Sequence, residues 1–178
     1  MNTDAQGFDA QGLDDPALIA FAEQARTVPL PPRAGVLARF SDMELIDSVV
    51  ERDGEFLLET SERGGQARPV VSSTALSPVR RALVLRLGAA ARYRLQLPRF
   101  EVPVDRAALP AGFELVDLPG AVELRWDESG TTLSARFWSG ASAANDAVRF
   151  ARFARASEAE LMAAFLDPKA RAVPPLVA

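Results

Sequence analysis

The sequence of 178 residues contains no cysteine and no histidine. The lack of cysteine excludes disulfide bonds, thiolate nucleophiles and thiolate metal sites. The lack of histidine removes the commonest general base, the Ser-His-Asp triad and the imidazole ligands of catalytic zinc. The glycine-containing loops lack the lysine or the glycine spacing of phosphate-binding loops. We therefore predict a protein without a metal or a cofactor.

Lysine is also scarce: Lys169 is the only lysine, whereas there are nineteen arginines. The 24 acidic residues outnumber the 20 basic ones, which gives a formal net charge of −4. A chain with this balance has no overall field that attracts nucleic acid or anionic lipid. We therefore expect neither a nucleic-acid nor a membrane partner.

Long apolar runs are absent too, since none approaches the roughly 20 residues that span a bilayer. The first residues, MNTDAQGFDAQGLDD, are acidic and polar, unlike a signal or transit peptide. These features favour a cytoplasmic protein.

Turn signals between β-rich segments predict two antiparallel meanders. Residues 43–73 are typical of three strands separated by an Asp-Gly turn and a Gly-Gly turn. Residues 112–140 are typical of a second meander, with turns at Pro119-Gly120 and over residues 127–130. We expect most of the sheet to be antiparallel.

Three helices have recognisable start signals or periodicity. Asp15 is placed to cap a helix that begins at Pro16. A second helix is predicted over residues 77–94. The third opens with Ser157 and Glu160, the two residues of a capping box.

The order of these elements predicts an α+β fold, because helices do not alternate with single strands. We expect a disordered lead-in over residues 1–13 and one domain over residues 14–178. The segment 146–156 is ambiguous: Val148 and Phe150 alternate as in a strand, whereas its arginines recur at helical spacing. We favour a strand there, with SGASAAND joining two strands.

The helix over residues 77–94 carries five arginines. At about 100° per residue, its apolar positions from Leu76 to Ala90 share one stripe, which we assign to the core. Arg81 and Arg92 project to a common side away from that stripe. The arginines form no single track for a nucleic-acid backbone, which favours solvated side chains. A smaller subset such as Arg81 with Arg92 could still anchor an acidic partner.

Paired carboxylates are the main remaining option for catalysis. Asp14 and Asp15 fit helix capping, and the other neighbouring acidic pairs fall at hairpin turns. We therefore predict no catalytic residue. An enzyme would require a deep pocket holding at least two titratable side chains with shifted pKa values.

Two tryptophans and several arginines are the best candidates for contact with a protein partner. Trp126 and Trp138 lie near opposite ends of one expected hairpin, where core packing is the simpler explanation. Arg136 and Trp138 project to the same side of a strand in SARFWSG, and both residue types are enriched at interface hot spots. The candidate contacts are Arg136, Trp138, Trp126, Arg81 and Arg92.

Two longer stretches together resemble a known family. SSTALSPVRRALVLRLGAAARYRLQLPRF holds a capped helix that ends in Gly-x-x-x-Arg and is followed by Leu-Pro. FARFARASEAELMAAFLDPKARAVPP holds a Ser-capped helix and FLDP followed by proline. The pair resembles the immunity proteins of polymorphic toxin systems, and most closely the antitoxins that neutralise NAD-hydrolysing toxins of the tuberculosis-necrotizing-toxin type. The end differs, since family members often have Gly after DP and finish with Pro-Leu and an aromatic residue.

The resemblance implies a monomer that binds the toxin domain in the producing cell as a 1:1 complex and blocks its NAD site. It also implies that the family-like residues are structural rather than partner contacts; these are Arg92, Ser157, Phe165, Asp167 and Pro168. A second hypothesis is a secretion chaperone or adaptor, which would expose an apolar groove and often form dimers.

Overall fold

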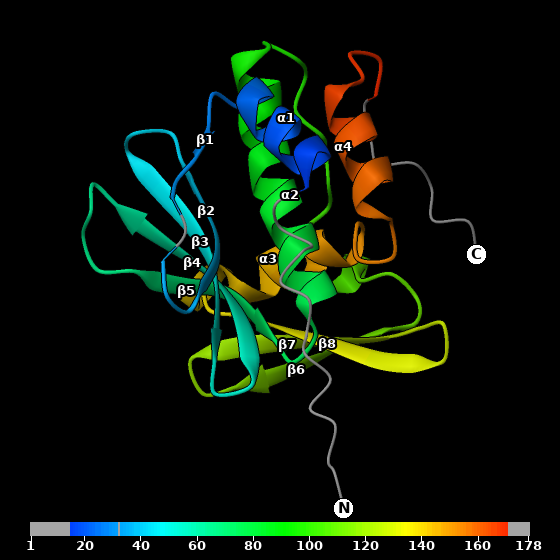
Figure 1. Ribbon diagram of the computed structural model, residues 1–178. Helices are drawn as coiled ribbons and strands as arrows, with labels where there is room; N and C mark the ends of the chain where they lie inside the picture. Colours follow the sequence, from blue (N-terminus) through cyan, green and yellow to red (C-terminus); the bar gives the residue numbers. More distant parts are fainter. Residues whose placement is uncertain (1–14, 32, 171–178) are drawn as a thin grey trace, which may run out of the picture.

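One eight-stranded antiparallel sheet and four α-helices make up the computed structural model, which describes residues 15–31 and 33–170 (Figure 1). The strands are β1 (Val28–Pro29), β2 (Val36–Ser41), β3 (Leu45–Arg52), β4 (Glu55–Glu62), β5 (Arg68–Ser73), β6 (Phe113–Leu118), β7 (Ala121–Glu128) and β8 (Thr131–Phe137). The α-helices are α1 (Pro16–Gln24), α2 (Leu76–Arg94), α3 (Ala143–Ala151) and α4 (Glu158–Leu166). The α+β prediction is confirmed. The expected lead-in, residues 1–13, lies outside the described residues.

The two predicted meanders join edge to edge into a single sheet of order β1-β2-β3-β4-β5-β8-β7-β6. The junction is the antiparallel pair β5–β8, with Val71 opposite Phe137 and Ser72 opposite Arg136. The sequence patterns did not identify β1 and β2 as strands. In the structure these two strands extend the first meander at its edge.

The Asp-Gly turn between β3 and β4 shows why local sequence predicted these hairpins. Asp53 and Gly54 both have positive φ, at 53° and 76°. A type I′ turn needs left-handed backbone at both central residues, which Asp and Gly tolerate. The turn therefore fixes the register of Val49 opposite Leu58 in the core.

The prediction of a strand over residues 146–156 is wrong. Residues 143–151 form α3, so the described part of the chain has four α-helices where about three were predicted. SGASAAND leads through a short 3₁₀ turn, Gly140–Ser142, into this helix and does not join two strands. The buried residues of α3 include Ala147, Phe150 and Ala151, which recur at helical spacing. This helical period outweighs the strand-like alternation of Val148 and Phe150.

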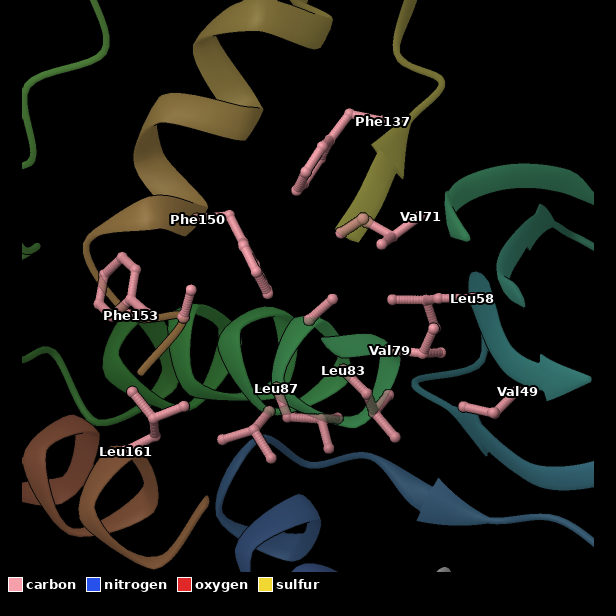
Figure 2. Packing of buried hydrophobic residues seen from close by; sticks show 14 of the residues in the cluster. Val49, Leu58, Val71, Val79, Leu83, Leu87, Phe137, Phe150, Phe153 and Leu161 are labelled. Carbon is pink, nitrogen blue, oxygen red and sulfur yellow. The ribbon is translucent and has the colours of Figure 1, made fainter. Parts of the chain in front are cut away.

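The helices gather on one side of the sheet, with α1, α2 and α4 side by side and α3 over β7 and β8 (Figure 1). Figure 2 shows α2 at the centre of the core, with sheet residues Val49, Leu58 and Val71 near its first turns. The predicted stripe is confirmed at Val79, Leu83 and Leu87, each at most 2% exposed.

The prediction of solvated arginines on α2 fails for Arg81 and Arg92, which are only 8% and 2% exposed. Other elements pack against the side of α2 that a single-helix projection assigns to solvent. Within the described residues, no helix is long and apolar enough to cross a membrane.

Candidate protein-binding surface

Arg136 lies on the sheet face opposite the helices. Its strand neighbours Ala135 and Phe137 are in the core, and side chains alternate between faces along a strand. The Arg136 guanidinium donates hydrogen bonds to Glu123 at 2.9 Å and to Glu55 at 2.8 Å. Arg125 donates to Glu123 as well, at 2.6 Å. These side chains form a charged cluster with members from β4, β7 and β8.

Two members of this cluster, Glu123 and Arg136, are stabilised in their ionised forms. Burial opposes ionisation of Glu123, but hydrogen bonds from Arg136 and Arg125 outweigh it and hold its pKa below the usual value. The hydrogen bond to Glu123 raises the pKa of Arg136. The cluster therefore presents a fixed arrangement of charge, which lowers the cost of ordering side chains when a partner binds.

Trp138 follows β8 and is 36% exposed. Its indole Nε1 donates to the Ser72 hydroxyl at 3.2 Å, and its backbone N–H donates to the Val70 carbonyl at 3.1 Å. Since Ser72 lies opposite Arg136, the structure brings Trp138 and Arg136 to the same face. An anchored, partly exposed tryptophan beside an arginine has the composition of an interface hot spot.

Trp126 and Arg81 lie in the interior and share one acceptor. Arg81 donates to both carboxylate oxygens of Glu128, at 2.8 and 2.6 Å, and to the Ala154 carbonyl. The indole of Trp126, 2% exposed, donates to Glu128 at 3.1 Å. The hydrogen bond from Arg81 lowers the pKa of Glu128. This network ties α2 to the end of β7 and to the α3–α4 connection.

Arg92 is buried among backbone carbonyls at the end of α4. It donates to Phe165 at 3.0 Å, Asp167 at 3.1 Å and Ala170 at 2.9 Å. It also donates to Pro98 at 2.6 Å. A helix C-terminus carries partial negative charge, which stabilises a cation placed there. Arg92 therefore holds α4 and the connection after α2 against each other.

The structure thus separates the five sequence-predicted contact residues into two groups. Arg81, Arg92 and Trp126 have interior partners, and their burial argues against direct contact with another protein. Arg136 and Trp138 lie on the surface together, and they remain the candidate contacts.

A cavity of about 420 Å³ lies between the end of α2, α3 and α4. Most of the residues that line it are apolar, and the charged ones are Arg92, Arg99 and Arg149. Among the residues that the structure describes, no carboxylate lines it, so they supply no carboxylate pair for general acid–base catalysis. No group of three potential metal ligands occurs among the residues that the structure describes.

These features define an α+β module with partly exposed surfaces suited to a protein partner. A family model described as Immunity protein 61 matches residues 19–173, and the chain belongs to this family. The predicted resemblance to immunity proteins is therefore confirmed. The solved structure of Rv3902c from M. tuberculosis is similar in fold, with a TM-score of 0.74 at 16% identity, over 94% of this chain and 97% of that chain. No curated protein matches the chain.

Proposed function

We propose that this protein is an antitoxin that binds a secreted NAD-hydrolysing toxin domain in the cytoplasm of the producing cell and blocks its NAD site. The observation that carries the proposal is the family match over residues 19–173, which implies a cognate toxin as partner. The choice of an NAD-hydrolysing toxin rests on the resemblance of the Gly-x-x-x-Arg and FLDP segments. The inhibitor acts as a monomer in a 1:1 complex.

The charge of the chain supports this choice of partner. A domain that binds the anionic dinucleotide NAD needs positive charge around its site, whereas this chain has a net charge of −4. Complementary charge accelerates association and disfavours wrong partners. An inhibitor that must capture the toxin soon after synthesis benefits from a fast encounter.

Arg136 and Trp138 are proposed contacts with the toxin. The ion pairs of Arg136 and the hydrogen bond of Trp138 hold both side chains before binding. Because they are already ordered, little rotamer entropy is lost in the complex.

The test uses this chain and the toxin-like C-terminal domain encoded next to its gene. Calorimetric titration gives affinity and stoichiometry, and NAD consumption is followed in the same mixtures. Complete loss of NAD hydrolysis at one equivalent supports the proposal. Tight binding with hydrolysis intact would identify a secretion chaperone or adaptor instead, and absence of binding would contradict both.

A further inference from the structure

Several large apolar side chains are exposed at the end of α2 and around the turn between β2 and β3. In the described part of the chain, Met43 is 92% exposed, Tyr93 65%, Leu95 43% and Leu45 39%. Val28 is 54% exposed and lies opposite Ser41, next to the turn that carries Met43. Large exposed apolar groups that gather at one place mark an interaction site.

Two cavities on either side of α2 are lined by two of these side chains, Leu45 and Tyr93. A cavity of about 270 Å³ is lined by Leu45, Ala89 and Ala90 on the β3 side of the helix. The 420 Å³ cavity is lined by Ala89, Tyr93 and Phe100 on the other side. Since Ala89 borders both, the two hollows form one surface with a low ridge of alanine. We define the α2 surface as Leu45, Ala89, Ala90, Tyr93 and Phe100.

The α2 surface is flanked by charges of opposite sign. Asp42 and Asp47 line the cavity on the β3 side, where Asp47 pairs with Arg86 at 2.9 Å. Arg99 and Arg149 line the other cavity, and Arg149 pairs with Asp146 at 3.2 Å. Arg99 forms no hydrogen bond or ion pair with any residue that the structure describes, so its charge is available to an acidic group. An apolar centre with a polar rim is the usual anatomy of a protein interface.

We propose that the toxin domain docks on the α2 surface, inserting an apolar side chain beside Tyr93 and Phe100. A carboxylate of the toxin faces Arg99, and a basic side chain faces Asp42. This inference rests on the proposed function and deepens it, because it adds a contact with the toxin on α2, on the other side of the sheet from Arg136 and Trp138. The complementary charges on the two flanks fix the orientation of the toxin.

The test measures binding of the toxin domain encoded next to the gene to four purified forms of the full chain. Ala89→Trp places a bulky ring on the ridge between the two cavities. Arg99→Glu reverses the charge on one flank of the surface. Thr131→Trp adds the same bulk at an exposed position of the β7–β8 hairpin as a matched control. Should Ala89→Trp fail to fold, Tyr93→Ala removes an exposed ring at the same place. Circular dichroism and sedimentation check folding and self-association.

We expect Ala89→Trp and Arg99→Glu each to weaken binding by about tenfold or more, which is the size of a hot-spot effect, while Thr131→Trp changes it by less than about twofold. Binding of both α2 variants within about twofold of the unaltered chain would overturn the inference and leave the proposed function intact. Loss of self-association with unchanged toxin affinity would assign the surface to a second copy and overturn it too. If the unaltered chain does not bind, the proposed function itself fails.

Discussion

Gly88 of α2 lies directly against the ring of Phe165 of α4. A Cβ atom added at Gly88 would stand less than 3.0 Å from three carbons of that ring. One turn further on, Arg92 donates to the Phe165 and Asp167 carbonyls. The Gly-x-x-x-Arg and FLDP segments are therefore two halves of one helix contact.

Replacing Gly88 by alanine should destabilise the fold. Overpacking of a core contact costs about 1–3 kcal/mol, although alanine recovers up to about 1 kcal/mol through its helix propensity. We expect the urea midpoint to fall. Adding Phe165→Leu should return part of the loss, because a smaller side chain makes room for the methyl group. A Gly88→Ala variant that is as stable as the unaltered chain would contradict the contact.

Replacing Arg92 by methionine should cost about 3 kcal/mol, because buried carbonyls at the end of α4 lose a charged donor. Arg92→Lys should also lower the free energy of unfolding, since a lysine ammonium cannot reach all the carbonyls to which the guanidinium donates. Urea denaturation measures both. The matched control is Arg94→Ala at an exposed position of the same helix, expected to change stability by less than about 0.5 kcal/mol. Equal effects at the two positions would refute the role of Arg92.

Acid should destabilise the protein through Glu123 and Glu128. Their pKa values in the folded state lie below the usual value of 4.5, so the unfolded chain binds more protons as the pH falls past 4.5. The stability that these carboxylates contribute is present above 4.5 and is lost as the pH falls through the folded pKa. Glu128→Gln should lower stability at about pH 7 and flatten the decline between about pH 5 and pH 3. An unchanged slope in urea melts across that range would show that Arg81 does not stabilise ionised Glu128.

Trp138→Ala and Arg136→Ala should each weaken toxin binding by more than about 1 kcal/mol. The first substitution removes exposed aromatic area from the interface, and the second removes a guanidinium that is already ordered. Thr132→Ala, an exposed change on the same strand, is the control. Calorimetric titration gives the affinities, and unchanged values with intact folding would reject this placement.

Local sequence signals predicted the parts of the fold that local chemistry determines. The Asp53-Gly54 turn and the Ser157–Glu160 capping box set their own backbone conformation, so the hairpin and the last helix were predictable. The α3 helix was missed because Val148 and Phe150 fit either period, and packing on the sheet decided between them.

The candidate surface was harder to predict, because exposure depends on what packs against each element. Arg81 and Arg92 were expected in solvent, but the end of β7 and α4 supply their acceptors from residues far along the chain. Conversely, Met43 and Tyr93 have no sequence signal that marks them as exposed. Their exposure follows from the turn after β2 and from the side of α2 left open by α1 and α4.

The most direct test of the central claim is growth of cells that produce the toxin domain encoded beside this gene. If the chain is an immunity protein, cells that also produce it will grow and keep their NAD, whereas cells with the toxin alone will stop growing. Cells that arrest although the folded chain accumulates would contradict the account.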